Sequence, residues 1–449
     1  MIVHPIDYRY GTKEMKRIWS EDSRIKRMIR VEIALLKALA RKGYLSEEIV
    51  RKIADKARKI SAERVKEIEA EIKHDVMALV RAISEVAEDD RWIHFGATSN
   101  DIIDTAVATQ LRDSVKILEV KLAKLALKLA EKAEKYKELV CLGRTHGQAA
   151  LPTTYGFRFA LWASEIKRHL ERLEEMKKRL LVGKMSGAVG TQAAFGEEGF
   201  EIEEEVMRLL NLKPVEISSQ VIPRDIYCEY VGFLANLAAT LEKIATNIRI
   251  LQRAETAELF ERFEAKQVGS STMPHKRNPI DSEQICGLAR VIRGFVEPQH
   301  QSSILWEERD LTNSSAERII LVEATVLTDH ILSKMIKVIE ELGINERAVR
   351  ENLERQRGLN MSEAVMIALT RKGMSRQEAH EVLRRLSMKA YEENRHLKDV
   401  LLEDEKIREL LSEEEVEELV KPENYLGTAL ERVERVVESV RSFAKSYVE

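Results

Sequence analysis

The chain of 449 residues has few residues that turn or break secondary structure. It contains 8 prolines and 19 glycines, too few for a sandwich or barrel, in which the chain must reverse every ~8–12 residues. Long helices with few corners are the expected alternative. On length alone we expect two or three domains with ample buried core.

Cysteine is also scarce. Cys141, Cys228 and Cys286 are odd in number, widely spaced and form no CxxC pair. The sequence therefore predicts neither a disulfide framework nor a zinc site, and we interpret the three residues as buried fillers.

Net charge and long apolar runs are absent as well. The 73 basic and 76 acidic residues leave a formal charge of -3, so no bulk attraction to nucleic acid or to an anionic membrane follows. No apolar run approaches the ~18 residues of a membrane span, and the first ten residues lack the basic and apolar pattern of a signal peptide. We expect a cytoplasmic protein that binds neither nucleic acid nor membrane.

Several motifs of common chemistries are missing. No GxxxxGK[ST] phosphate loop and no GxGxxG occurs. His380 and Glu381 begin like the HExxH pattern of zinc peptidases, but Arg384 occupies the second histidine position. We therefore set aside these nucleotide-binding motifs and a zinc peptidase, and we expect no metal site.

What the sequence does contain is long helical periodicity. Apolar residues spaced by threes and fours form one stripe from Val107 to Leu129, along a helix of about ten turns, and another stripe from Phe233 to Leu251. A segment from about Ser315 to Leu342 is apolar around more of its circumference, which indicates burial on several sides. A weaker stripe runs from Phe157 to Met176. These segments predict an all-α fold.

The helical pattern changes twice along the chain. Shorter amphipathic segments precede the long ones, and short segments follow them, with capping-box spacing at Ser375 with Glu378 and at Ser412 with Glu415. We predict three helical domains: residues 1–97, a central elongated long-helix bundle at 98–344, and residues 345–449. The long helices can bury more helices than one chain supplies, so they are expected to build a multi-chain helical core.

The most specific polar interruption of the helices spans residues 269–279. It reads Gly-Ser-Ser-Thr-Met-Pro-His-Lys-Arg-Asn-Pro, with small residues, two prolines and three basic side chains. Standing alone, such a stretch is most often a surface loop. Loops that move over a ligand have the same composition.

This motif resembles the signature loop of the fumarase/aspartase superfamily, and its His-Lys pair after Met-Pro is most similar to the adenylosuccinate lyase and carboxymuconate cycloisomerase branches. Other segments resemble the adenylosuccinate lyase family: Arg9-Tyr10, Lys73-His74-Asp75-Val76, Gly96-Ala97-Thr98-Ser99-Asn100-Asp101, Arg144-Thr145-His146-Gly147-Gln148 and Glu308 to Arg318. Lys73 stands where that family more often has Arg, and Asn100 where Ser is common, which affects the expected nucleotide contacts more than the reaction.

The resemblance implies a homo-oligomer, a tetramer with shared active sites, that needs no cofactor and eliminates fumarate from a small-molecule nucleotide substrate, adenylosuccinate. It also implies the parallel elimination from the succinylated aminoimidazole carboxamide ribonucleotide. Such an elimination needs a base for a proton next to a carboxylate, donors for the developing dianion and an acid for the departing nitrogen.

Two residues are predicted to carry the proton transfers. Ser270 is the predicted base, although a serine hydroxyl serves only if N–H groups, a helix N-terminus and cations such as Lys276 stabilise its alkoxide. His146 is the predicted acid, because imidazole titrates near neutral pH. His74 is expected to support the acid together with Asp75.

The remaining candidates are expected to bind substrate. Those assigned to the succinyl carboxylates and the reacting region are Thr98, Ser99, Thr145, Gln220, Ser271, Lys276, Arg277 and Asn278. Those assigned to the nucleotide and its phosphate are Arg9, Tyr10, Lys73, Arg309, Ser314 and Arg318.

Each motif also has a plain structural explanation. His146 could hydrogen-bond a helix end, His74 and Asp75 could be an exposed pair, residues 98–101 could cap the following helix, and Arg309 and Arg318 could be surface charges. Two rival functions also remain: a related lyase acting on argininosuccinate or a carboxymuconate, and a non-catalytic helical scaffold. The scaffold explains the helices but not the Ser, His and Lys motifs that interrupt them.

Overall fold

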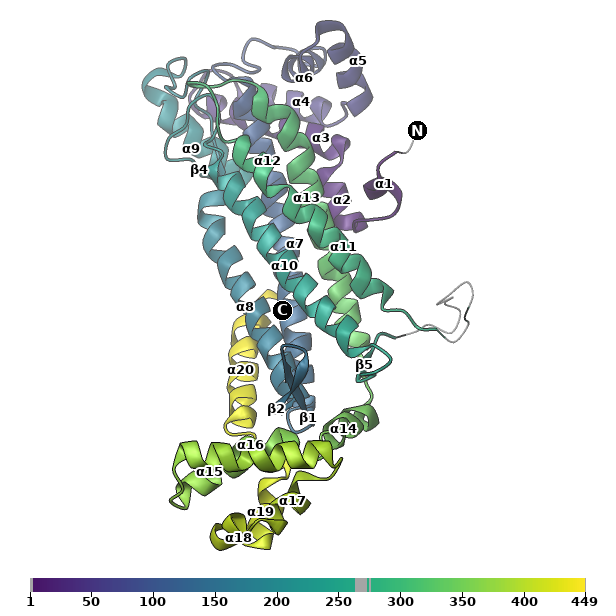
Figure 1. Ribbon diagram of the computed structural model, residues 1–449. Helices are drawn as coiled ribbons and strands as arrows, with labels where there is room; N and C mark the ends of the chain where they lie inside the picture. Colours follow the sequence, from purple (N-terminus) through teal and green to yellow (C-terminus); the bar gives the residue numbers. More distant parts are fainter. Residues whose placement is uncertain (1–2, 263–272, 274–275, 449) are drawn as a thin grey trace. The chain divides into compact units, whose positions relative to one another are not determined.

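A computed structural model describes residues 3–262, 273 and 276–448, and these residues are predominantly helical (Figure 1). The prediction of an all-α fold is confirmed. The four long helices lie where the apolar stripes predicted them: α7 (Ser99–Lys135), α8 (Tyr155–Leu180), α10 (Asp225–Leu251) and α13 (Thr312–Glu341).

Shorter helices account for most of the remaining chain. The first six are α1 (Pro5–Tyr8), α2 (Lys13–Trp19), α3 (Glu21–Arg41), α4 (Glu47–Ala57), α5 (Ala62–Ile72) and α6 (Asp75–Ser84). Between the long helices lie α9 (Gly199–Leu210), α11 (Ile280–Gly294) and α12 (Val296–Gln301). The C-terminal part holds α14 (Glu346–Glu354), α15 (Ser362–Arg371), α16 (Arg376–Glu392), α17 (Leu397–Glu403), α18 (Glu405–Leu410), α19 (Glu413–Leu419) and α20 (Ala429–Ala444).

Within the described ranges, the strands form three short pairs. These are the antiparallel pair β1 (Val140–Thr145) and β2 (Gln148–Thr154), the parallel pair β3 (Val182–Gly183) and β4 (Lys213–Pro214), and the antiparallel pair β5 (Leu259–Phe260) and β6 (Gly343–Ile344). The β1–β2 hairpin replaces the helical connection that an all-helical pattern would suggest between α7 and α8.

The chain forms two compact units. The first comprises Met1–Lys121, His169–Leu241 and Cys286–Ser333, and the second comprises Leu122–Arg168, Glu242–Ile285 and Lys334–Glu449. The four long helices contribute residues to both. This division groups residues by compactness, and the three consecutive domains proposed from the sequence remain a prediction.

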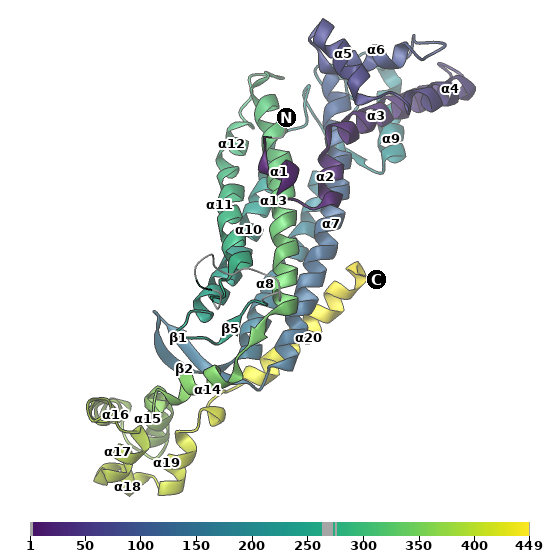
Figure 2. The ribbon, with the colours of Figure 1, turned by 90° about the vertical axis from the view of Figure 1, so that its right-hand side faces the viewer.

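The core of the first unit joins a helix bundle to a layer of shorter helices. Buried polar pairs connect the bundle helices: Tyr230 of α10 with Thr325 of α13 at 2.9 Å, and His169 of α8 with Thr240 of α10 at 2.8 Å. Residues of α3, α4, α5, α6 and α9 share an apolar cluster with the start of α7 (Figure 2). The amphipathic pattern of the first ~95 residues therefore reflects packing against one common core.

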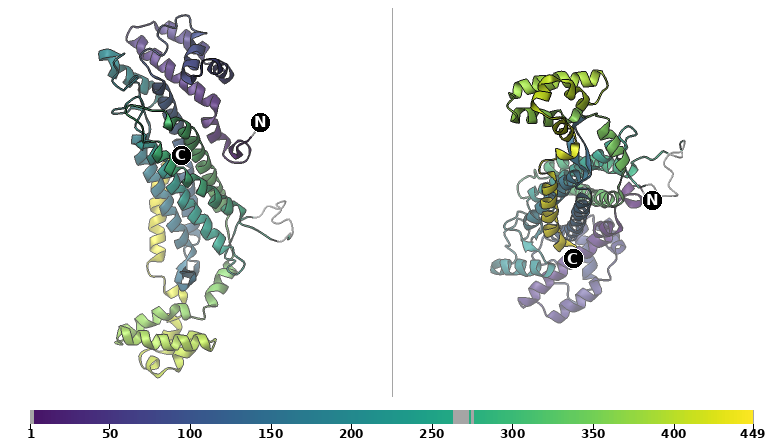
Figure 3. Two further views of the ribbon diagram at one scale, coloured as in Figure 1. Left: turned by 45° about the horizontal axis from the view of Figure 1, so that its top comes forward. Right: turned by 90° about the horizontal axis from the view of Figure 1, so that it is seen from below.

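The second unit contains the hairpin, the ends of the long helices and the C-terminal helices. Helices α15 to α19 share their own apolar cluster, centred on residues such as Leu369, Leu386 and Leu401 (Figures 1 and 3). The capping box predicted at Ser412 and Glu415 is present, whereas Ser375 caps α16 through its side chain alone.

Cys141 and Cys286 are buried, and Cys228 is partly buried. Among the described residues, no helix combines the length and the hydrophobicity needed to cross a membrane.

Candidate active site

A cavity of about 680 Å³ in the first unit brings together many of the residues singled out in the sequence. The predicted residues that line it are Lys73, His74, Asp75, Ser99, Gln220, Arg309, Ser314 and Arg318. They come from the ends of α5, α6, α7 and α13 and from two loops. Sequence positions up to 245 residues apart (73 to 318) thus meet in one place.

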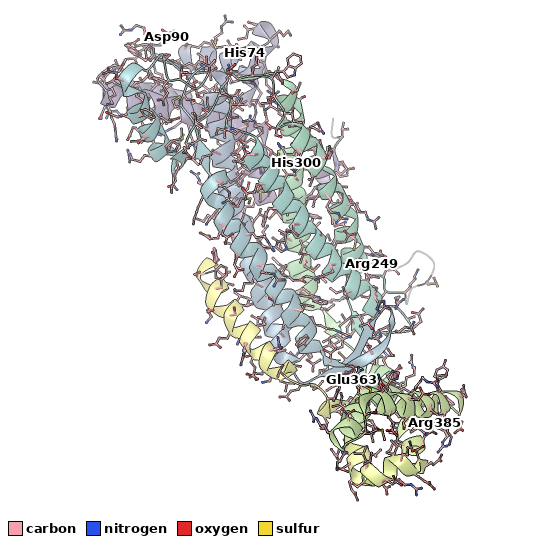
Figure 4. All side chains as sticks on the ribbon, turned by 60° about the vertical axis from the view of Figure 1, so that its left-hand side comes forward. His74, Asp90, Arg249, His300, Glu363 and Arg385 are labelled. Atoms are coloured by element: carbon pink, nitrogen blue, oxygen red, sulfur yellow. The ribbon has the colours of Figure 1, made fainter. Side chains whose placement is uncertain are left out.

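The Lys73-His74-Asp75 segment forms the sharp junction between α5 and α6. Lys73 ends α5 in the left-handed conformation with φ 57°, and His74 is the N-cap of α6, where its Nδ1 accepts the backbone N–H of Met77 at 3.2 Å. A neutral His74 therefore carries its proton on Nε2. His74 is labelled in Figure 4.

Asp75 contacts the backbone of α6 and the side chain of Arg318. Its Oδ1 accepts the N–H of Val76 at 2.8 Å and lies 3.9 Å from His74 Nδ1, so the helix N-terminus, not Asp75, fixes the tautomer of His74. Its Oδ2 accepts a hydrogen bond from Arg318 at 2.8 Å. Asp75 thereby connects α6 to α13 across the cavity wall.

The Thr98-Ser99 segment begins α7, as its sequence predicts. The N–H of Thr98 donates to Asp101 Oδ2 at 2.8 Å. Asp101 is fully buried and also accepts the N–H groups of Ser186 at 2.9 Å and Gly187 at 3.0 Å, and it pairs with Lys184. One carboxylate therefore fixes the helix start and a neighbouring loop to each other.

Gln220 is held near the same helix start by a second buried carboxylate. Asp104 accepts two hydrogen bonds from Arg224, at 2.8 and 2.9 Å, and one from the N–H of Ile222 at 3.0 Å. Arg224 also lies beside a third buried carboxylate, Glu317 of α13, with its Nε 3.2 Å from Glu317 Oε1. Burial raises the pKa of the Glu317 carboxyl, and the charge of Arg224 opposes that rise.

Arg309 is a cation that hydrogen-bonds neutral oxygens. It donates to the amide oxygen of Asn100, to that of Gln220 at 3.1 Å and to the carbonyl of Asp310 at 3.3 Å. Within the part of the chain that the structure describes, no carboxylate lies within ion-pair distance of its guanidinium. Burial lowers the pKa of Arg309. A partly buried guanidinium that bonds neutral acceptors is suited to bind an anion.

Arg9 and Tyr10 lie at the end of α1 and are not among the residues that line this cavity. The Arg9 guanidinium is 6.0 Å from the centroid of the Tyr10 ring, which in turn is 5.5 Å from the ring of His330 on α13. Thr12 donates to the buried Asp329, also on α13, at 2.5 Å. These contacts fix the N-terminal segment along α13.

The predicted acid His146 occurs in the second unit, at the tip of the β1–β2 hairpin. Thr145 pairs with Gln148, so His146 and Gly147 form a two-residue turn with φ 53° and 76°. Two successive positive φ values are typical of type I′ hairpin turns, in which asparagine and glycine are preferred. The exposed side chain of His146 stands on a strained backbone, a common feature of functional residues.

The signature motif lies mostly outside the described residues, including Ser270 and Ser271. Its end is described: Lys276 and Arg277 are exposed and Asn278 is partly buried. Glu261, before the motif, accepts hydrogen bonds from the N–H and Oγ of Ser282, after it. Gln252 also contacts both flanks, accepting from Glu261 N at 2.9 Å and donating to the Arg277 carbonyl at 3.3 Å. The two flanks of the motif are thus held together at the start of α11.

Sequence reasoning missed the buried carboxylates that organise these segments. Asp101, Asp104, Glu258 and Glu261 look like ordinary charges in a chain that is 33% charged. The available signal was the position of Asp101 and Asp104 on α7, one turn apart among apolar neighbours. Glu69 and Ile103 also line the cavity and lie outside every motif noted in the sequence. Other lining residues belong to those motifs but were not among the predicted site residues: Asn100, Asp310, Leu311 and Ser315. Among the described residues, no three His, Cys, Asp or Glu side chains group as a metal site requires.

Comparison with known proteins gives the family. Residues 7–294 match the model of a family described as Lyase, and residues 358–436 match one described as Adenylosuccinate lyase C-terminus. The chain is 73% identical over 445 residues to the adenylosuccinate lyase of Archaeoglobus fulgidus, covering 99% of this chain and 100% of that one. The chain belongs to the adenylosuccinate lyase family. It is therefore an enzyme of the lyase class.

Other relatives agree with this assignment. The adenylosuccinate lyase of Methanocaldococcus jannaschii is 53% identical, with 98% of this chain and 97% of that protein covered. A fumarate lyase from Mesorhizobium sp. BNC1 matches with a TM-score of 0.88 at 32% identity, over 95% of this chain and 98% of that one. A 3-carboxy-cis,cis-muconate lactonizing enzyme from Pseudomonas putida also has a TM-score of 0.88, at 31% identity, over 98% and 99%. The fold is thus shared across the superfamily, whereas the relatives named adenylosuccinate lyase are closer in sequence.

Proposed function

We propose that this enzyme eliminates fumarate from adenylosuccinate to give AMP, and that it performs the same elimination on the succinylated aminoimidazole carboxamide ribonucleotide. The observation that carries the proposal is Arg309, a partly buried cation that faces a cavity and whose hydrogen-bond partners among the described residues are all neutral. A phosphate-bearing substrate supplies the missing anion. Argininosuccinate and carboxymuconates carry no phosphate.

The reaction proposed is a general base and acid elimination. Ser270 takes a proton from the succinyl carbon next to a carboxylate, whose negative charge grows and is stabilised by N–H and cationic donors. The bond between the succinyl carbon and the purine nitrogen then breaks, and His146 gives a proton to that nitrogen. Fumarate and AMP are the products. The elimination changes no net oxidation state, so the proposed reaction needs no external oxidant or cofactor.

The predicted binding groups fall into two sets in this proposal. Arg309, Arg318 and Ser314 hold the nucleotide phosphate, together with Lys73, Arg9 and Tyr10. Thr98, Ser99, Thr145, Gln220, Ser271, Lys276, Arg277 and Asn278 serve the succinyl carboxylates. His74, with its proton on Nε2, hydrogen-bonds the reacting region beside the acid.

We further propose a cytoplasmic homotetramer whose sites draw residues from more than one chain. Large apolar side chains are exposed on each long helix, as at Val120, Leu161, Ile250 and Ile319, where the exposed fractions are 41%, 52%, 43% and 54%. Such side chains are suited to burial against symmetry mates. Ser270→Ala and His146→Ala chains, each inactive alone, should then regain activity when re-associated as mixed oligomers. Mixed oligomers without recovery would place both residues in one chain.

The direct test of the function is fumarate release by the purified protein from adenylosuccinate, without added metal or cofactor. Argininosuccinate and 3-carboxymuconate, offered at the same concentration, are the controls. Turnover of adenylosuccinate alone supports the proposal. Turnover of either control at a comparable kcat/KM, with none of adenylosuccinate, would replace it with a rival lyase.

A further inference from the structure

Glu258 is a carboxylate with no exposure to solvent in the second unit. It lies at the start of the short pairing between β5 and β6, one residue before Leu259. Its backbone is fixed on both sides, because its N–H donates to the Leu251 carbonyl at 2.9 Å and its carbonyl accepts the N–H of Asn345 at 2.8 Å. The side chain therefore projects from a rigid point.

Four side chains from three other elements converge on this carboxylate. Arg144 of β1 donates to Oε1 at 2.8 Å, and Asn352 of α14 donates to the same oxygen at 2.9 Å. Tyr155, the first residue of α8, donates to Oε2 at 2.5 Å, and Arg158 lies 3.5 Å from that oxygen. Burial, the largest cause, raises the pKa of the Tyr155 phenol, and the neighbouring Glu258 raises it further. Tyr155 therefore remains a donor at neutral pH.

Packing alone does not account for a buried charge at this position. An apolar side chain of similar volume often stabilises a core as well as a buried ion pair does. A carboxylate also fixes the orientation of its partners, because its two oxygens accept hydrogen bonds from planar guanidinium groups in defined directions. The geometry of Glu258 thus specifies where Arg144 and Tyr155 must lie.

Those two residues are the fixed points of the hairpin that carries His146. Arg144 precedes His146 by two residues on β1, and Tyr155 follows the last residue of β2. The pairing register shifts at Gly143, where a Cβ would lie 2.4 Å from the Leu151 carbonyl. Arg158 also donates to the Leu142 carbonyl at 2.7 Å, next to this irregularity. A bulge redirects the strand beyond it, so the direction of the turn depends on how Arg144 is held.

We propose that Glu258 is a positioning residue for the elimination. By holding Arg144 and Tyr155 it sets the orientation of the β1–β2 hairpin, and thereby the place from which His146 delivers its proton. This inference rests on the proposed function, in which His146 is the acid. A displacement of about 1 Å at a reacting group can lower a rate by roughly a hundredfold.

The test compares Glu258→Gln with a matched control, Glu119→Gln. Glu119 is likewise a buried carboxylate with a cationic partner, Lys177 at 2.6 Å, but it lies in the middle of α7 in the first unit and is not a candidate site residue. With adenylosuccinate, Glu258→Gln is expected to lower kcat by about 10- to 100-fold and to leave KM within about threefold, whereas Glu119→Gln keeps both. Tyr155→Phe removes one donor only and is expected to give an intermediate kcat.

Hydrogen exchange of the peptide covering residues 140–154 supplies a readout that does not depend on activity. It is expected to become faster in Glu258→Gln and to stay at the parental rate in Glu119→Gln, with equal far-UV circular dichroism. Parental kcat or parental hairpin exchange in Glu258→Gln would overturn the inference, as would equal losses in the control. If the parent releases no fumarate, the proposed function fails, while the exchange data still decide whether Glu258 holds the hairpin.

Discussion

Asp104 and Arg224 form a doubly hydrogen-bonded ion pair, at 2.8 and 2.9 Å, in which both side chains are 2% exposed. The pair connects the second turn of α7 to the segment that precedes α10. That segment includes Gln220, and α7 begins with Ser99, so the pair fixes two parts of the candidate substrate cavity relative to each other.

Breaking this pair is expected to destabilise the protein strongly. Asp104→Asn leaves Arg224 buried beside Glu317 without its main partner, at a cost of about 3–5 kcal/mol. Thermal unfolding should show a midpoint lower by several degrees. The triple variant Asp104→Leu, Arg224→Met and Glu317→Gln, which removes all three buried charges, should unfold closer to the parent. A triple variant no more stable than Asp104→Asn would contradict this explanation.

The same pair predicts a pH dependence. Burial would raise the pKa of the Asp104 carboxyl, but Arg224 and the N–H of Ile222 hold it below its ordinary value. A carboxyl whose pKa is lower in the folded state contributes stability above its unfolded value of about 3.9 and loses that contribution as the pH falls through the folded value. The difference in unfolding midpoint between the parent and Asp104→Asn should therefore be constant near neutral pH and shrink below about pH 4. A difference that grows on acidification would refute the assignment.

The phosphate role of Arg309 predicts substrate-dependent losses. A charge-assisted hydrogen bond is worth ~1.5–3 kcal/mol, so Arg309→Met should lower kcat/KM for adenylosuccinate by roughly 10- to 100-fold. The dephosphorylated compound, succinyladenosine, should already be a poor substrate for the parent and should lose much less on substitution. Arg384→Met is the control, because Arg384 is exposed and pairs with Glu381 one turn away on α16. Equal losses on both compounds in Arg309→Met would remove the phosphate from the account.

The helices could be predicted from the sequence because apolar periodicity reports directly which face is buried. On α7, every residue of the predicted apolar stripe from Leu111 to Leu129 is buried. Helix α13 covers nearly the whole segment that was predicted from about Ser315 to Leu342. The location of many cavity residues was likewise accessible through motif resemblance. Lys73, Ser99 and Arg309 come from three different motifs and line one cavity, although no local pattern connects them.

The hairpin and the buried carboxylates could not be predicted in the same way. Residues 140–154 alternate irregularly, and the turn uses His146-Gly147 in place of the usual Asn-Gly, so its strand pairing depends on tertiary contacts such as those of Glu258. The sequence alone does not distinguish a buried glutamate from an exposed one. Only the assembled partners, Arg144 and Tyr155 here, distinguish them.

The central claim is that Ser270 starts an elimination from adenylosuccinate, and it is tested most directly by kcat and substrate affinity in Ser270→Ala. Loss of a proton-transfer group costs about 10²–10⁴-fold in rate, and removal of a proton from a weakly acidic carbon should lie at the upper end of that range. The account predicts a fall in fumarate release of that size with adenylosuccinate Kd unchanged within a few fold, measured by equilibrium binding. A Ser270→Ala enzyme with the parental kcat would contradict it.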